Sequence, residues 1–169
     1  TIAKSKIPTI ALAHGFCIGG ATSLVSACDI RLATKDAKFS IGETKLGLVA
    51  DVGVIQRMPK IVSSGDMNEL ALTGRIFDGE HAEKIRFVSK AYGNSDELFE
   101  AGEKLANEIS SNSKRIVQAT KEALEKSSNL TVDQGLEYAK LWSTSFLVSE
   151  DLREGVMAFL EKRDPKFNE

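Results

Sequence analysis

Short apolar runs separated by turn-forming residues mark the first third of the chain. Residues 7–13 and 30–33 have the length and composition of buried strands, and residues 38–41 form a third run of this kind. Between the first two runs lies a stretch of small residues, 21–28, which predicts a compact helix. The order strand, helix, strand predicts a βαβ-like rhythm and an α/β fold.

The middle of the chain predicts short helices and one further strand. Serine and aspartate stand where helices are expected to begin, and glycine where one is expected to end, which are their favoured positions. The predicted elements are a helical turn over 54–59 that stops near Pro59, a helix begun by Ser64 or Asp66 and ended by Gly74, a helix over 79–85 capped by Asp78, and a strand over 86–92.

Apolar residues recur at helical spacing from Ser95 onward. The predicted helices are 95–110 with Ser95 as its cap, one that begins at Asn112 or Ser113, 132–146 capped by Thr131, and one that begins at Ser149 and is stopped by Pro165. Trp142 and Phe159 are expected in a core or subunit contact, not in a cofactor site. The change of pattern predicts two regions, an α/β part over 1–93 and a helical part over 94–169.

The composition limits the partners of the chain. Its 169 residues are 42% hydrophobic, which suits one domain with a hydrophobic core. The formal net charge of −2 does not favour nucleic acid or an anionic membrane, and no apolar run approaches a membrane span. Cys17 and Cys28 stand alone in apolar settings, which indicates buried thiols in an intracellular, reducing compartment. A strand follows Thr1 almost at once, as expected of a piece of a longer polypeptide.

Candidate acid–base chemistry lies in residues 42–53. Glu43 and Asp51 are eight positions apart in a stretch that is otherwise apolar and contains three glycines. A general acid–base site needs two titratable groups in an apolar cavity, on a backbone that can bring them together. The alternative is structural: Glu43 would cap a helix or pair with Lys45, and Asp51 would be the N-cap of the next segment.

A second candidate is the turn at Gly19 and Gly20, which opens the predicted helix directly after the strand and its glycine-rich turn. Glycine lets a ligand approach the backbone, and a helix N-terminus offers free N–H groups to a phosphate or a developing oxyanion. The spacing of Gly15, Gly19 and Gly20 does not match the G-x-G-x-x-G dinucleotide fingerprint, and no P-loop pattern is present. The alternative is a tight packing turn.

Other catalytic systems find little support in the sequence. His14 and His81 are the two histidines, and neither has partners at metal-ligand spacing, so we expect no metal site. A serine–histidine–aspartate system of Ser23, His14 and Asp51 would lack the usual G-x-S-x-G turn.

Several ordered motifs run along nearly the whole chain, namely residues 14–24 with 27–31, 39–43 with 47–48, 50–53 with 56–60, 70–74, and 150–155 with 159–163. Together they resemble the signature of the crotonase (enoyl-CoA hydratase/isomerase) superfamily. The Ala-Asp-Val-Gly of residues 50–53 is similar to the dienoyl-CoA isomerase branch, because hydratases usually have a small residue in place of the aspartate. The resemblance implies an α/β spiral of ββα turns followed by an α-helical trimerisation region.

The resemblance also implies site residues. Glu43 matches the catalytic glutamate shared by hydratases and dienoyl-CoA isomerases, and Asp51 matches the additional aspartate of the isomerases. Gly20 matches one of two backbone N–H donors of the oxyanion hole, with Gly19 beside it as a substrate contact. The other donor, and most of the nucleotide-binding half, would lie upstream of Thr1. Ser23 falls on a substrate-contacting position that is usually acidic, and it cannot ionise in the acid–base role.

The function implied is a shift of double bonds in unsaturated (dienoyl) acyl-CoA through a thioester enolate. The alternatives are hydration of 2-enoyl-CoA and, from another class, a catalytically weak acyl-CoA-binding or assembly subunit. No cofactor is expected, because coenzyme A is part of the substrate. The expected assembly is a homotrimer or a dimer of trimers. The expected compartment is the cytoplasm of a bacterium, or the mitochondrial matrix or peroxisome of a eukaryote.

Overall fold

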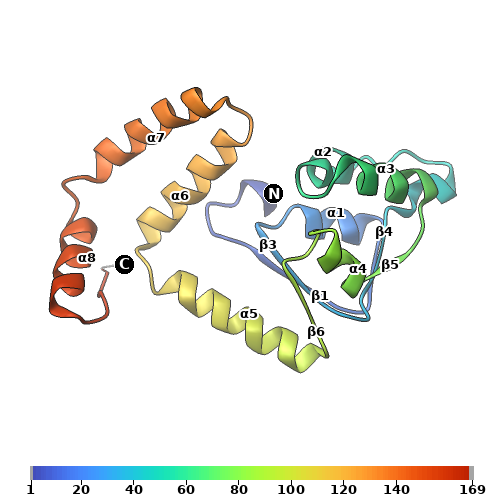
Figure 1. The fold of residues 1–169 in the computed structure, drawn as a ribbon, viewed down its shortest axis with the longest axis horizontal. Coiled ribbons are helices and arrows are strands. Elements are labelled where there is room, and N and C mark those ends of the chain that lie inside the picture. Colours follow the sequence, from blue (N-terminus) through green and yellow to red (C-terminus); the bar gives the residue numbers. More distant parts are fainter. Residues whose placement is uncertain (1, 168–169) are drawn as a thin grey trace. The chain divides into compact units, whose positions relative to one another are not determined.

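The computed structural model describes residues 2–167, and Figure 1 labels most of its helices and strands. The chain divides into two compact units. The first consists of Thr1–Ser5 and Thr9–Lys104, and the second of Lys6–Pro8 and Leu105–Glu169. Each unit is described separately below.

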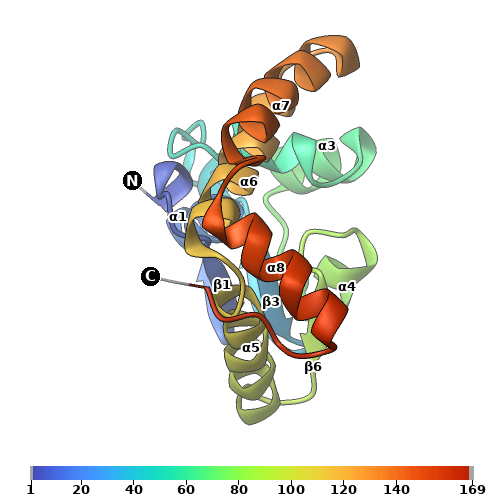
Figure 2. The same ribbon diagram turned by 90° about the vertical axis from the view of Figure 1, so that its left-hand side faces the viewer.

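The first unit contains a parallel sheet of three strands in the order β1-β3-β6, which lie side by side in Figure 2. The strands are β1 (Ile10–Ala13), β3 (Ile30–Thr34) and β6 (Lys90–Tyr92). Helix α1 (Gly20–Ser26) lies between β1 and β3 in the chain, so the predicted strand–helix–strand unit is confirmed. The strand predicted over 86–92 is shorter than expected, because Arg86 adopts a left-handed φ of 65°.

A second sheet of three strands has the order β2-β4-β5. These strands are β2 (Phe16–Ile18), β4 (Lys38–Ser40) and β5 (Phe77–Asp78). The sequence predicted β4 but not β2 or β5. Strand β2 is an apolar run of only three residues between Gly15 and Gly19, and Cys17 alone is buried in it, so the sequence around it predicted a turn. Burial raises the pKa of the Cys17 thiol, and Cys17 is buried as predicted. Cys28 was also predicted to be buried, but it is only half-buried.

The two sheets together form a spiral. Strands β1 and β2 precede α1, and β3 and β4 precede the next helices, so each turn of the chain supplies two strands and then helix. The second turn stacks on the first, because β1 pairs with β3 and β2 pairs with β4, both in parallel. Three buried phenylalanines pack at the second sheet, with Phe39 5.5 Å in ring-centroid distance from both Phe77 and Phe87.

The remaining helices of the first unit are α2 (Val54–Arg57), α3 (Ser64–Thr73) and α4 (Gly79–Lys84). The predicted caps of α3 are wrong: the Ser63 hydroxyl, one residue earlier than expected, accepts the Asp66 N–H at 3.1 Å. Gly74 ends this helix with a left-handed φ of 58°, as predicted. The Asp78 carboxylate accepts the His81 N–H at 2.9 Å and caps α4, also as predicted.

Helix α5 (Ser95–Ser110) precedes α6 (Lys114–Ser127), α7 (Val132–Phe146) and α8 (Glu150–Glu161). Ser95 is not the cap of α5, because the Asn94 side chain accepts the Glu97 N–H at 2.9 Å and Ser95 already lies in the helix. Side chains cap the other three helices as predicted, namely those of Ser113, Thr131 and Ser149.

The end of α8 differs from the prediction. The helix stops at Lys162, which adopts a left-handed φ of 54°, and therefore does not reach Pro165. Arg163 then folds back, and its guanidinium lies 2.6 Å from a carboxylate oxygen of Glu154. Hydrogen bonds from the Arg163 guanidinium, together with one from the Lys166 backbone N–H, lower the pKa of Glu154 to about 2.

We expect Gly79→Ala to destabilise the first unit strongly. A Cβ at this position would lie 1.9 Å from the backbone oxygen of Thr34, and backbone cannot move aside as a flexible side chain can. The expected loss in the free energy of unfolding is about 2–4 kcal/mol. Gly65→Ala is the matched control at an exposed position of helix α3, where the nearest atom would lie 3.8 Å away and a gain of about 0.5–1 kcal/mol is expected. Urea denaturation measures both, and equal effects would contradict the clash.

Candidate active site

Glu43 lies in a short 3-10 helix, Gly42–Leu46, that begins just after strand β4. The side chain is half-buried. Its Oε2 atom is buried and has no hydrogen-bond partner among the described residues. Most buried polar atoms in proteins are hydrogen-bonded, so an unpaired carboxylate oxygen is an unusual feature that needs an explanation.

The Glu43 carboxylate lies against the Gly19–Gly20 turn. A Cβ built on Gly19 would lie 3.4 Å from Glu43 Oε1, an ordinary van der Waals contact, so the carboxylate packs directly beside this turn. Gly19 also has φ 58° and ψ −116°, a backbone conformation that L-residues avoid. Gly20 is the first residue of α1, and its N–H therefore has no acceptor within the helix.

The parallel pairing of β2 with β4 explains why these segments meet. Ile18 and Ser40 are partners in the register and are the last residues of their strands. The carboxyl ends of parallel strands lie at one edge of a sheet. The chain leaving β2 therefore forms the glycine turn beside the chain that leaves β4 and carries Glu43.

A cleft of about 500 Å³ opens at this edge of the sheet. Its lining combines glycine backbone, apolar side chains, one carboxylate and one lysine. The lining residues are Ile18, Gly19, Gly20, Ser40, Gly42, Glu43, Lys45, Leu46, Gly74 and Ile76. An apolar pocket with a few convergent polar groups is the usual form of a small-molecule site.

Within the described residues, Glu43 and Asp51 do not have the capping and ion-pair roles that the sequence left open. No ion pair joins Glu43 to Lys45 there, and Glu43 caps no helix. The N-cap of α2 is Gly53, not Asp51, and no side chain caps that helix. Neither carboxylate is therefore accounted for by local backbone stabilisation.

The structure brings Glu43, Gly19 and Gly20 together but places the other two site candidates elsewhere. Asp51 is exposed and does not line the cleft. Ser23 is buried in α1, also outside the lining, and its Oγ has no hydrogen-bond partner among the described residues. Sequence reasoning did not assign Gly74 or Ile76 to the site, because the only local signal there was the helix-ending glycine.

Residues 2–167 contain neither a cluster of metal-ligating side chains nor a membrane-spanning helix. No group of three or more histidine, cysteine, aspartate or glutamate residues in that part of the chain could hold a metal ion. No helix within those residues is both long and apolar enough to span a membrane.

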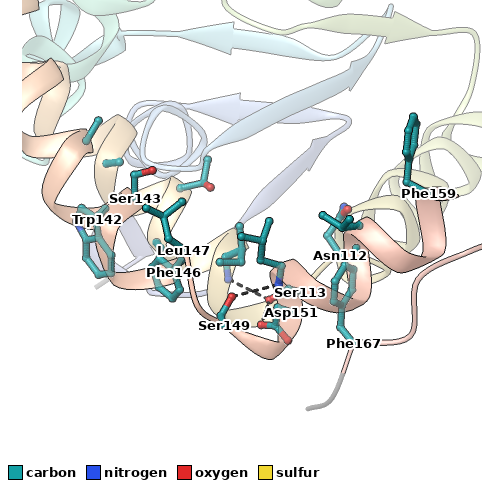
Figure 3. Close-up of a pocket in the computed structure, with 18 of the residues that line it drawn as sticks. Asn112, Ser113, Trp142, Ser143, Phe146, Leu147, Ser149, Asp151, Phe159 and Phe167 are labelled. Carbon is teal, nitrogen blue, oxygen red and sulfur yellow. Dashed lines mark hydrogen bonds between the residues drawn. The ribbon is translucent and has the colours of Figure 1, made fainter.

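The second unit has a cavity of its own, of about 640 Å³, with largely apolar walls (Figure 3). Trp142 and Phe146 come from the end of α7, Leu147 is the residue that caps this end, and Phe159 comes from α8. The polar groups at this cavity are already satisfied in part, since the Ser113 hydroxyl donates to Asp151 at 2.6 Å. No candidate acid–base group of the sequence lies here.

Comparisons with protein families and with individual proteins both point to enoyl-CoA hydratases and isomerases. A family profile described as "Enoyl-CoA hydratase/isomerase" matches residues 1–169. The mitochondrial Delta(3,5)-Delta(2,4)-dienoyl-CoA isomerase of Dictyostelium discoideum is 49% identical over 98% of this chain, and the peroxisomal one of Arabidopsis thaliana is 43% identical over 98%. The chain spans 57% and 60% of the length of these two relatives.

Among solved structures, an enoyl-CoA hydratase of Bacillus anthracis superposes with a TM-score of 0.92 at 30% sequence identity. The match covers 98% of this chain and 64% of that one. The predicted α/β spiral fold is therefore confirmed, as is the predicted resemblance to the family and to its dienoyl-CoA isomerases.

We expect the stability of the protein not to depend on the Glu43 carboxylate. In Glu43→Met the loss of an unpaired, partly desolvated charge should leave the free energy of unfolding unchanged or raise it by up to about 1 kcal/mol. Glu83→Met is the matched control, because Glu83 is also half-buried but its Oε2 accepts the Ala91 N–H at 3.1 Å. That variant should lose about 1–3 kcal/mol. Equal losses in urea denaturation would mean that Glu43 is structural.

Proposed function

The chain belongs to the enoyl-CoA hydratase/isomerase family, and from this membership we propose that it takes part in shifting double bonds of unsaturated, dienoyl acyl-CoA thioesters. The observation that carries the proposal is the Glu43 carboxylate, which has an unpaired oxygen and lies beside the Gly19–Gly20 turn in a largely apolar cleft. The likeness to dienoyl-CoA isomerases supports this choice of substrate over other acyl-CoA compounds.

The proposed reaction uses the turn and the carboxylate in succession. The Gly20 N–H donates a hydrogen bond to the thioester oxygen, which becomes negatively charged when an enolate forms. Glu43 or Asp51 removes a proton from a carbon of the acyl chain. The electron pair of the broken C–H bond enters the conjugated system. The other group returns a proton further along the chain, so the double bonds move and no atom is gained or lost.

Asp51 and Ser23 determine which residues can form the acid–base pair of the proposed reaction. Asp51 is exposed beside the exposed apolar residues Leu48, Val49 and Val52. A bound acyl chain would cover such residues and give the aspartate an apolar surrounding. Ser23 replaces a group that could ionise, which leaves Glu43 and Asp51 as the acid–base pair and disfavours hydration through two glutamates.

A second candidate function rests on Ser23. Its hydroxyl is buried and has no hydrogen-bond partner among the described residues, and it cannot act as a general base by ionising. A protein that binds acyl-CoA or supports an assembly, with weak catalysis, would tolerate this replacement. Hydration of 2-enoyl-CoA, with Glu43 positioning the water, is the alternative within the family.

The proposed function needs no cofactor, because coenzyme A enters as part of the substrate. The related isomerases are described as mitochondrial in Dictyostelium discoideum and peroxisomal in Arabidopsis thaliana. We propose one of these compartments for this chain if its source is eukaryotic, and the cytoplasm if it is bacterial.

The proposed assembly is a homotrimer or a dimer of trimers built through the helical region. Helix α7 has no buried residue, and its Leu141 is 71% exposed. Phe159 of α8 is 81% exposed. Large exposed apolar side chains on two helices are typical of a surface that another chain covers.

Activity tests the proposed chemistry. We expect the complete natural protein to isomerise 3,5-dienoyl-CoA, followed by its absorbance, and Glu43→Gln and Asp51→Asn each to lower turnover by roughly 10²–10⁴-fold because a proton-transfer group is lost. Asp36→Asn is the control, since Asp36 is an exposed residue of the turn between β3 and β4 and should leave turnover unchanged.

Three results would redirect the proposal. Hydration of 2-enoyl-CoA with no change in the dienoyl substrate would favour the hydratase alternative. Binding of acyl-CoA without turnover of either substrate would favour the binding subunit. Unchanged turnover in Asp51→Asn would remove Asp51 from the acid–base pair.

Light scattering tests the assembly. We expect the complete natural protein to have the mass of three or six chains, and Phe159→Glu to lower that mass because it places a charge in an apolar contact. Arg153→Glu, an exposed position of the same helix, should leave the mass unchanged. A wild-type protein with the mass of one chain would contradict the proposal.

A further inference from the structure

The Ser40 carbonyl joins the two segments of the candidate site. Ser40 is the last residue of β4, is 2% exposed, and precedes Glu43 by three positions. Its carbonyl oxygen accepts the Gly19 N–H at 2.9 Å and the Thr22 hydroxyl at 3.0 Å. One atom therefore fixes the turn that carries the Gly20 N–H relative to the segment that carries Glu43.

Thr22 extends this connection to strand β2. Its side chain is fully buried, and its hydroxyl donates to the carbonyl of Cys17 as well as to that of Ser40. A hydroxyl has a single proton, so the two carbonyls share one donor. The Thr22 Oγ also lies 3.4 Å from the Ser40 N–H, which it accepts. The side chain therefore bridges β2 and β4 just before both strands end.

Thr22 does not line the cleft, so it can affect chemistry there only through the residues that it holds. We propose that Thr22 is a positioning residue whose buried hydroxyl sets the distance between the Gly20 N–H and the Glu43 carboxylate. This inference rests on the proposed function, because it assumes that these two groups act on one bound thioester.

The catalytic rate depends on where the Gly20 N–H and the Glu43 carboxylate lie relative to each other, more than on the free energy of unfolding. An oxyanion donor and a base must meet their atoms in the transition state together, and a misplacement of about 1 Å can lower a rate by about 100-fold. Substrate binding depends less on this distance, since the apolar walls of the cleft do not change. Loss of the Thr22 hydroxyl should therefore lower kcat and leave KM nearly unchanged.

The chain offers a matched control in Thr34. This threonine of β3 is 2% exposed, but its hydroxyl has no hydrogen-bond partner among the described residues. Thr34→Val therefore removes a buried hydroxyl of the same kind without breaking a bond. It separates the bridging role of Thr22 from the general effect of a valine in the core.

The experiment compares Thr22→Val, Thr22→Ser and Thr34→Val in the complete natural protein with 3,5-dienoyl-CoA. We expect Thr22→Val to lower kcat by about 10- to 100-fold with KM within about twofold, and Thr22→Ser to restore kcat to within about threefold of wild type. Thr34→Val should match wild type. A kcat for Thr22→Val within about twofold of wild type would overturn the inference while leaving the proposed function intact.

Amide hydrogen exchange at Gly19 provides a readout that needs no turnover. Its N–H is bonded to the Ser40 carbonyl, so a loosened bridge should raise its exchange rate by about 10-fold in Thr22→Val and not in Thr34→Val. Absence of turnover in the wild-type protein would contradict the proposed function. In that case the exchange measurement still tests the bridging role, because an unchanged Gly19 exchange rate in Thr22→Val would overturn it. If Thr22→Val does not fold, Thr22→Cys, with a weak S–H donor, should give an intermediate loss of kcat, and full activity there would overturn the inference.

Discussion

The parallel pairing of β2 with β4 is the constraint on which the candidate site depends. Parallel strands place their carboxyl ends at the same edge of the sheet. Ile18 and Ser40 are partners in the register, so the segments that follow them both begin at the site. Gly19 then turns in a backbone conformation that only glycine adopts easily, and Glu43 follows Ser40 on a short 3-10 helix. Without this register the glycine turn and the carboxylate would not meet, because Gly20 and Glu43 are 23 positions apart in the sequence.

The sequence predicted elements well where several residues share one pattern. The strands β1 and β3, the helix between them and the caps Ser113, Thr131 and Ser149 follow from apolar runs and capping residues. It predicted poorly where an element is formed by pairing alone. Strands β2 and β5 have three and two residues and stand next to turn-forming glycines, so only their partners in the sheet define them as strands.

In the candidate site, too, the individual residues could be predicted from the sequence, but their arrangement could not. Glu43 could be singled out because a carboxylate among glycines and apolar residues is unusual, and Gly19 and Gly20 because of their place before a helix. Their proximity could not be read from composition or spacing, since it follows from the register of β2 and β4. The roles of Thr22 and Ser40 were hidden for a similar reason. The sequence does not show which atoms a buried hydroxyl bonds, and the acceptors of the Thr22 hydroxyl are backbone carbonyls of strands β2 and β4.

Burial and hydrogen bonding separate the polar groups of the first unit into two kinds. The hydroxyls of Thr22 and Ser40 are buried and bonded to backbone carbonyls, so they stabilise the edge of the sheet. The Oε2 of Glu43 is buried without a partner and contributes no such bond within the described residues. A fold selected for stability alone would replace that carboxylate with an apolar side chain. The bonded hydroxyls hold the backbone rigid around a group that the fold itself does not satisfy, and this arrangement is what preorganised chemistry requires.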